Sequence, residues 1–301
     1  MPDIIDKINA LRKEKKAVIL AHLYQQPQVQ DIADFVGDSL DLSRKAKDND
    51  ADIIVFCGVW FMAETAKILS PQKIVLLPEK DAGCPMADMV TAEDVKKLRK
   101  EHPKAAVVCY VNSGADIKAL SDICCTSSNA VKVVQSLKEE EIIFVPDQNL
   151  GAYVSKFVPE KRFILHPGYC PTHHRIKLAD VMAARAALPG VPLLVHPECT
   201  PKVVEMADFV GSTAQIINET VRSQSQEFII GTESGVLHRL KQLSPDKKFY
   251  ALRSTMVCPN MKKTTLDSVY YALKNMQYKI ELPEEVIKAA SVSLERMLLI
   301  R

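Results

Sequence analysis

Three Cys-Pro dipeptides recur at nearly equal intervals along this chain of 301 residues. They begin at Cys84, Cys170 and Cys258, which are separated by 86 and 88 positions. Thiolates are the usual ligands of iron–sulfur clusters, whereas zinc sites usually draw on local C-x2-C pairs, which these three cysteines lack. If the fold brings them together, three thiolates would hold a four-iron cluster and leave one iron open to a substrate. Three buried structural thiols are the alternative interpretation.

Other chemically active residues repeat with the same offsets. An apolar run ends three times in a residue with a titratable ring, and these residues are His22, Tyr110 and His196. A hydroxyl residue follows each of them after 17 positions, which gives Ser39, Ser127 and Thr213. Self-similarity at a fixed period indicates a repeated structural unit. Three like units around a pseudo-threefold axis would direct their equivalent residues to one centre.

Each repeat predicts the same order of short strands and helices. The expected strands cover 17–22 and 52–56 in the first copy, 105–110 and 141–145 in the second, and 191–196 and 227–230 in the third. The expected helices that follow the hydroxyl residues cover 40–48, 128–138 and 214–223. Such alternation is typical of βαβ units with a parallel sheet. We therefore expect three homologous three-layer α/β/α domains, over residues 1–103, 104–189 and 190–301.

The repeated residues are expected at the edge of a sheet where ligands bind. In open parallel sheets, ligands bind beyond the carboxyl ends of the strands. Ser39, Ser127 and Thr213 each precede a predicted helix, and the spare N–H groups of a helix N-terminus bind phosphate or carboxylate. The same residues could instead be plain helix N-caps. As ligands, they would line a cavity for a substrate with several negative charges.

Glu198 and its neighbours could perform acid–base chemistry. Glu198 lies two positions after His196, as Asn112 does after Tyr110, so each pair shares one side of an extended segment. A histidine and a glutamate can hold opposite protonation states near neutral pH. His173, just after the second Cys-Pro, could supply another proton or serve only the local structure.

Composition excludes several classes of function. The chain is 47% hydrophobic and 25% charged with a net charge of +2, which is typical of globular proteins. Its basic residues are matched by acidic ones, so no nucleic-acid partner is expected. The apolar run at 17–20 is too short for a signal sequence or a membrane span, and we expect a cytoplasmic protein. Its eight cysteines then indicate metal binding or burial rather than disulfides.

The motifs resemble those of a known family. The segments that carry the resemblance are Gly83-Cys84-Pro85-Met86, Gly168-Tyr169-Cys170-Pro171, Cys258-Pro259-Asn260-Met261, Ala21-His22-Leu23-Tyr24, Gly37-Asp38-Ser39, Tyr110-Val111-Asn112, His196-Pro197-Glu198 and Gly211-Ser212-Thr213. They occur in the order typical of quinolinate synthases, from about residue 17 to residue 265. The chain is therefore similar to that family over nearly its whole length.

The resemblance implies a fold, a cofactor and a reaction. Quinolinate synthases have three homologous α/β domains around a [4Fe–4S] cluster with three cysteine ligands, here Cys84, Cys170 and Cys258. They condense iminoaspartate with dihydroxyacetone phosphate to give quinolinate, phosphate and water in NAD biosynthesis. This implies a functional link to an aspartate oxidase or dehydrogenase that supplies iminoaspartate.

The resemblance also implies a set of site residues. The candidates for substrate binding are His22, Ser39, Tyr110, Asn112, Ser127, His173, His196, Glu198, Ser212 and Thr213. The candidates for proton transfer are Glu198, His22 and Tyr24. Some family members carry C-x-x-C-x-x-C in the third cysteine loop as a proposed redox switch. Here Leu252 and Thr255 occupy the positions of the extra cysteines, so that regulation is not expected.

Without the resemblance, the residues leave two other functions open. One is a different cluster-dependent hydro-lyase that acts on a small hydroxy acid, since an open iron would serve that reaction equally well. The other is a non-catalytic anion-binding protein with three buried thiols.

Overall fold

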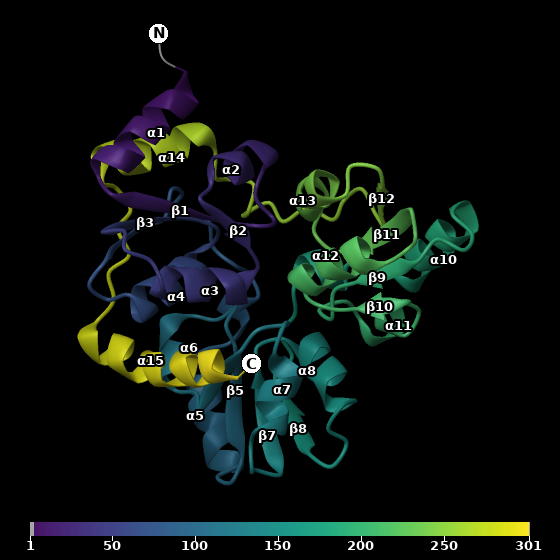
Figure 1. The fold of residues 1–301 in the computed structure, drawn as a ribbon. Helices are drawn as coiled ribbons and strands as arrows, with labels where there is room; N and C mark the ends of the chain where they lie inside the picture. Colours follow the sequence, from purple (N-terminus) through teal and green to yellow (C-terminus); the bar gives the residue numbers. More distant parts are fainter. Residues whose placement is uncertain (1–2, 301) are drawn as a thin grey trace.

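The computed structural model describes residues 3–300, which form three α/β lobes (Figure 1). Each lobe has a four-stranded parallel sheet with the same strand order, in which the second strand is at one edge, followed by the first, third and fourth. The strands are β1 (Ala17–His22), β2 (Phe35–Gly37), β3 (Ile53–Cys57) and β4 (Ile74–Leu76), then β5 (Ala106–Tyr110), β6 (Ile123–Cys125), β7 (Glu141–Val145) and β8 (Arg162–Leu165), then β9 (Leu193–Val195), β10 (Phe209–Val210), β11 (Glu227–Gly231) and β12 (Lys248–Ala251). The predicted fold class is confirmed.

Helices cover both faces of the sheets. The helices before the second sheet are α1 (Ile4–Glu14), α2 (Pro27–Ile32), α3 (Ser39–Lys47), α4 (Trp60–Leu69), the short 3-10 helix η1 (Ala87–Met89) and α5 (Ala92–Glu101). Those that follow are α6 (Ala115–Ala119), α7 (Ala130–Gln135), α8 (Gln148–Ser155), α9 (Pro171–His174), α10 (Leu178–Ala187), α11 (Pro201–Val204), α12 (Thr213–Arg222), α13 (Val236–Leu243), α14 (Leu266–Asn275) and α15 (Glu284–Leu299).

The first sheet shows why its apolar strands require helices on two sides. Successive side chains of a strand point to opposite faces. Val18 and Leu20 therefore pack with α3 and α4, whereas Ile19 and Ala21 pack with α1, α2 and α14. Water is excluded from both faces of the strand, as is usual for parallel sheets.

An Asp–Arg pair recurs in every lobe and attaches the second strand to the first. The segment before the second strand supplies Asp34, whose Oδ2 accepts a hydrogen bond of 2.8 Å from the N–H of Ile19, while its Oδ1 pairs with Arg12 at 2.9 Å. The equivalent carboxylates are Asp122 and Asp208, which accept from the first strands of their lobes. Some of the residues that repeat in the sequence therefore stabilise the fold of each lobe and do not belong to the shared cavity.

The repeated lysines also have a structural role. Lys161 and Lys247 directly precede the fourth strand of their lobes and donate to carbonyl groups at or just beyond the ends of α7 and α12. Lys73 donates in the same way to Asn49, just after α3. A cation near a helix C-terminus is favoured by the helix dipole.

One predicted helix is shorter than expected. The sequence predicts a helix over 128–138, but α7 begins at Ala130 and ends at Gln135. The side chain of Asn129 accepts hydrogen bonds from the N–H and the hydroxyl of Thr126, which closes a turn before the helix. Ser127 therefore lies in this turn and not at the start of a helix.

The last two helices pack on lobes that precede them in the sequence. α14 contacts α1 and β3 of the first lobe, and α15 contacts α4, α6 and β6 (Figure 1). The domain boundaries drawn from the repeat stay a prediction, but these two C-terminal helices complete the first and second lobes.

The hydrophobic core is divided unequally among the lobes. One continuous cluster extends from Leu20 and Phe56 in the first sheet to Val108 and Phe144 in the second, and it includes Leu294 of α15. Two further clusters lie on the two faces of the third sheet, and one of them includes Leu23 of the first lobe. Between residues 3 and 300, no helix has both the length and the apolar character needed to cross a membrane.

Candidate active site

The three repeated cysteines line one cavity. Cys84, Cys170 and Cys258 each lie in the loop that follows the fourth strand of their lobe. The other predicted residues in the wall are His22, Tyr24, Ser39, Tyr110, Asn112, Ser127, His173, His196, Glu198 and Thr213. The carboxyl ends of the three sheets therefore face a common space, to which every lobe contributes.

The environment of the cysteines is suited to a metal cluster. All three side chains are half-buried and free of disulfide bonds. Burial raises the pKa of Cys84 to about 12, and it also raises the pKa values of Cys170 and Cys258. The thiols would release protons on binding a metal, because only thiolates ligate it. Apolar residues complete this side of the cavity, namely Val59, Phe61, Met62, Met86 and Met261.

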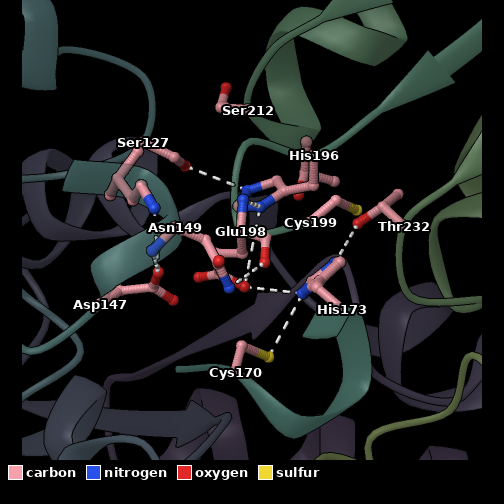
Figure 2. A network of polar contacts seen from close by, with 12 residues as sticks. Ser127, Asp147, Asn149, Cys170, His173, His196, Glu198, Cys199, Ser212 and Thr232 are labelled. Atoms are coloured by element: carbon pink, nitrogen blue, oxygen red, sulfur yellow. Dashed lines mark hydrogen bonds and ion pairs between the residues drawn. The ribbon is translucent and has the colours of Figure 1, made fainter. Parts of the chain in front are cut away.

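Glu198 is the centre of a buried polar network (Figure 2). Its Oε1 accepts a hydrogen bond of 2.7 Å from the phenol of Tyr110, and its Oε2 lies 2.6 Å from Nδ1 of His173. Burial alone would raise the pKa of Glu198, but the imidazoles of His196 and His173 and the hydrogen bonds from His173 and Tyr110 outweigh it and lower that pKa below its ordinary value. Glu198 is therefore an ionised carboxylate at neutral pH.

A group that could hold a metal ion includes the same glutamate. The sulfur of Cys170, one ring nitrogen of His173 and a carboxylate oxygen of Glu198 all lie within 4.8 Å of one another. Nδ1 of His173 is 3.2 Å from the sulfur of Cys170. The second cysteine loop is thus joined directly to the polar network.

His22 and His196 are neutral donors at equivalent positions. Burial lowers the pKa of each to about 3. Nδ1 of His22 accepts the N–H of Tyr24, and Nδ1 of His196 accepts the N–H of Glu198, so in both rings the proton is on Nε2. Nε2 of His196 lies 3.2 Å from the hydroxyl of Ser127. These rings can therefore donate hydrogen bonds but do not balance the charge of an anion.

Tyr24 connects the first lobe with the third. Its phenol lies 2.9 Å from the hydroxyl of Thr213 and 2.8 Å from that of Thr232. Its ring packs edge-on against His22, with 4.5 Å between the ring centroids. Burial, and secondly the charge of Glu198, raises the pKa of Tyr24 well above its ordinary value, so the phenol keeps its proton.

The repeated hydroxyl residues are not the caps of their helices. Asp38 caps α3 by accepting from the N–H groups of Leu40 and Asp41, so Ser39 is the first helical residue. Likewise Ser212 caps α12 in a capping box, and Thr213 is the first helical residue. The N-cap interpretation is therefore wrong for both positions, and both residues line the cavity instead.

Ser212 itself lies outside the cavity wall. Besides capping α12, its hydroxyl lies 2.7 Å from that of Ser128, and both hydroxyl groups donate to Oδ2 of Asp38, at 3.3 Å and 2.6 Å. This cluster joins one residue from each lobe. Of the predicted substrate-binding residues, Ser212 is the one that the structure places behind the wall and not in it.

Asn112 has an unused hydrogen-bond acceptor. Its Oδ1 is buried and has no hydrogen-bond partner among residues 3–300, although Asn112 lines the cavity. A buried polar atom without a partner is costly. This oxygen is therefore suited to accept a hydrogen bond from a bound ligand.

Comparison with known proteins agrees with the geometry. The sequence model of the family described as quinolinate synthetase A protein, NadA, matches residues 6–299. The chain is 57% identical over 299 residues to the quinolinate synthase of Alkaliphilus metalliredigens, covering 99% of both chains. It is 58% identical over 293 residues to that of Caldicellulosiruptor bescii, covering 97% of both chains. The chain belongs to the quinolinate synthase family.

The similarity to this family extends over nearly the whole chain. A third relative, the quinolinate synthase of Clostridium kluyveri, is 55% identical over 295 residues, which is 98% of this chain and 97% of the relative. The matches therefore include all three lobes and all three cysteine loops. In this family member, Leu252 is buried in the third lobe and Thr255 lies in the turn before Cys258.

Sequence reasoning missed three residues of this quinolinate synthase site. Asp38 and Glu233 line the cavity, and Thr232 lies behind Tyr24. Thr232 and Glu233 directly follow β11, so the rule about carboxyl ends could have found them had it been applied to every strand. Asp38 was within the Gly37-Asp38-Ser39 motif, but the sequence does not show that it, and not Ser39, caps the helix.

The remaining cysteines are not among the residues that line the cavity. Cys57, Cys109, Cys124, Cys125 and Cys199 are wholly buried and free. Cys109 is part of the core shared by the first two lobes, as the sequence predicts.

Proposed function

We propose that this chain condenses iminoaspartate with dihydroxyacetone phosphate to form quinolinate, phosphate and water for NAD biosynthesis. Full-length similarity to quinolinate synthases supports the activity. The observation that carries the assignment of the site is that cysteines, neutral imidazoles, phenols and helix N-termini from all three lobes share one cavity.

We infer that Cys84, Cys170 and Cys258 hold a [4Fe–4S] cluster. Three free thiols beside an apolar wall fit such a cluster, whose usual ligands are thiolates. A four-iron cluster with three protein ligands retains one open iron, which would supply a Lewis acid for the loss of a hydroxyl group.

The cavity residues then have separate tasks. The hydroxyls of Ser39 and Thr213, with the first-turn N–H groups of α3 and α12 that the caps Asp38 and Ser212 do not already hold, would bind the carboxylates and the phosphate. Because His22 and His196 are neutral, they would add hydrogen bonds through Nε2 but no positive charge. The positive ends of the helices would therefore provide much of the attraction for these anions.

Glu198 is the proposed proton acceptor of the reaction. Ring formation removes protons from carbon and nitrogen, and it delivers protons to leaving oxygen atoms. An ionised carboxylate beside the cavity can take the former, and the neutral phenols of Tyr24 and Tyr110 can give the latter. His22 shares the wall with Tyr24 and would orient the reacting groups.

The cellular setting is part of the proposal. We infer a cytoplasmic enzyme, since all eight cysteines are free, as expected in a reducing compartment. Imines hydrolyse readily in water. An enzyme that oxidises aspartate is therefore expected to deliver iminoaspartate at the rate of its use.

The first prediction tests the cluster and the activity together. Protein purified without oxygen should contain iron and sulfide, show brown visible absorbance, and form quinolinate from the two substrates. Cys170→Ala should lose both the absorbance and the product, because it removes one of three ligands. Cys57→Ala should keep both, since Cys57 is buried at the end of β3 and lies outside the cavity wall. Full cluster content in Cys170→Ala would contradict the assignment.

A further inference from the structure

The segment that follows the third strand of each lobe holds the cysteine loop of the same lobe. In every lobe, a backbone N–H of that segment donates to the carbonyl group of the residue two positions before the cysteine. The three pairs are Trp60 to Ala82 at 2.8 Å, Gln148 to Gly168 at 2.9 Å, and Ser234 to Met256 at 2.8 Å. The turn of each cysteine therefore starts from a backbone anchor that all three repeats share.

A carboxylate next to this anchor faces the cysteine in two of the three lobes. Asp147 and Glu233 occupy equivalent positions, each the second residue after the third strand of its lobe. The N–H of Cys170 faces the carboxylate of Asp147. In the third lobe, Oε1 of Glu233 accepts a hydrogen bond of 3.1 Å from the N–H of Cys258. The first lobe has the apolar Val59 at this position. Glu233 therefore holds a proposed cluster ligand at its own backbone N–H.

The third cysteine loop has less support from helices than the other two. In the second lobe α9 begins directly after Cys170, and in the first lobe η1 begins three residues after Cys84. Cys258 is followed by turns until α14, which begins at Leu266 and packs on the first lobe. Because no helix follows Cys258 within its own lobe, the shape of this loop depends on side chains that join its ends.

Glu233 and Lys262 close the third cysteine loop. Glu233 is wholly buried at the cavity wall, and Nζ of Lys262 lies 3.0 Å from its Oε1 and 3.2 Å from its Oε2. Oε2 also accepts a hydrogen bond of 2.7 Å from the N–H of Gly235. A single carboxylate thus holds the loop at Cys258 and again four residues later at Lys262.

We propose that Glu233 is a positioning residue that keeps Cys258 in place as a cluster ligand by joining the two ends of the third cysteine loop. Side chains behind a metal ligand fix its orientation and contribute to metal affinity. Without the carboxylate, the N–H of Cys258 and the ammonium group of Lys262 lose the acceptor that they share, and the thiolate is no longer held toward the cavity. This inference rests on the proposed function.

The experiment compares Glu233→Gln with the wild type in cluster-containing protein purified without oxygen. Glutamine keeps the shape but has one acceptor oxygen where Glu233 uses two, and it has no charge for Lys262. The rate of iron loss to a ferrous-iron chelator should therefore rise about 10- to 100-fold. Glu64→Gln is the matched control, because Glu64 is a buried carboxylate that accepts the N–H of Ala115 and not that of a cysteine. This control should lose iron at the wild-type rate.

Alkylation of the thiols separates the loss of one ligand from a general loss of structure. Iodoacetamide is present during iron loss, and mass spectrometry identifies the modified cysteines. Glu233→Gln should be labelled at Cys258 before Cys84 and Cys170. Wild-type iron retention in this variant, or equal labelling of the three cysteines, would overturn the inference. If Glu233→Gln does not accumulate, Lys262→Met carries the same test, since it removes the other half of the pair. A wild type without cluster iron would instead refute the proposed function.

Discussion

At the scale of single residues, Glu198 is the group whose charge organises the cavity. Tyr110 occupies one carboxylate oxygen and His173 the other, and the side chain is almost wholly buried. A buried carboxylate normally favours its neutral form, so the donors around it are needed to keep the charge. That arrangement is costly to maintain and is typical of functional sites.

Replacing that charge should disable the reaction without disturbing the fold. Glu198→Gln preserves the shape but neither carries a charge nor exchanges a proton, so kcat should fall roughly 10²- to 10⁴-fold. Steady-state quinolinate formation measures this change, and iron content should be unaffected. Glu227→Gln, at the partly exposed start of β11, is the control and should be normal. Near-normal turnover of Glu198→Gln with intact cluster would exclude the residue from the mechanism.

At the scale of elements, capping of the helix and contact with the cavity are carried out by two adjacent residues at the starts of α3 and α12. Asp38 and Ser212 cap the helices, while Ser39 and Thr213 occupy the first turn and line the cavity, where the hydroxyl of Thr213 bonds to the phenol of Tyr24. A helix end can thus be stabilised and still keep donors for an anion. Substitutions of the two kinds of residue should therefore differ in their effects.

Ser39→Ala should weaken substrate binding but leave stability nearly unchanged. Loss of one hydrogen bond to a charged group costs about 1.5–3 kcal/mol, so KM should rise about tenfold or more. Thr265→Ala is the matched control, because Thr265 caps α14 and does not line the cavity. That control should lose about 1 kcal/mol of stability, with KM unchanged. Urea unfolding and initial rates measure both, and a purely thermal effect of Ser39→Ala would favour a structural role.

Much of the element pattern was predictable because it depends on local signals. Apolar runs and turn residues predicted the strands, and the spacing of Cys84, Cys170 and Cys258 predicted a shared site. The start of α7 was missed because the side chain of Asn129 competes with the backbone of the helix. Thr232 was missed because its partners lie 59 and 208 positions away in the sequence. Contacts of that range depend on how the lobes pack.

At the scale of the whole molecule, the third lobe is attached differently from the other two. The first and second lobes share one extensive hydrophobic core, whereas the third lobe contacts the first through a smaller cluster that includes Leu23 and through many polar contacts. Gln30 donates to the carbonyl of Gly235, and Lys262 donates to the carbonyl of Tyr24. Lys262 also pairs with Glu233 at 3.0 Å, and Glu233 is wholly buried.

Removing Lys262 should reveal how much this buried pair contributes. Lys262→Met leaves Glu233 without a counter-charge, which should lower the free energy of unfolding by about 3 kcal/mol at neutral pH. Burial raises the pKa of Glu233 above its ordinary value even beside Lys262. The deficit should therefore shrink as the pH falls from about 7 to about 5, since protonation removes the buried charge.

The control for this prediction is a pair on the surface. Lys248→Met breaks an ion pair with Glu227 whose lysine is largely exposed, and such pairs contribute little. Urea unfolding of both variants at the two pH values makes the comparison. Equal stability of Lys262→Met and Lys248→Met at neutral pH would mean that the third lobe is held by other contacts.

The first sheet is synthesised first, but one of its faces is packed by a helix that is synthesised near the end of the chain. Its strands end at Leu76, yet α14, which supplies Val269 and Leu273 to one of its faces, begins only at Leu266. At a synthesis rate of about 5–20 residues per second, that face of the sheet stays exposed for roughly 10 to 40 seconds before α14 is made. A nascent chain stalled in this interval should present an incomplete first lobe to chaperones, although that lobe was synthesised first.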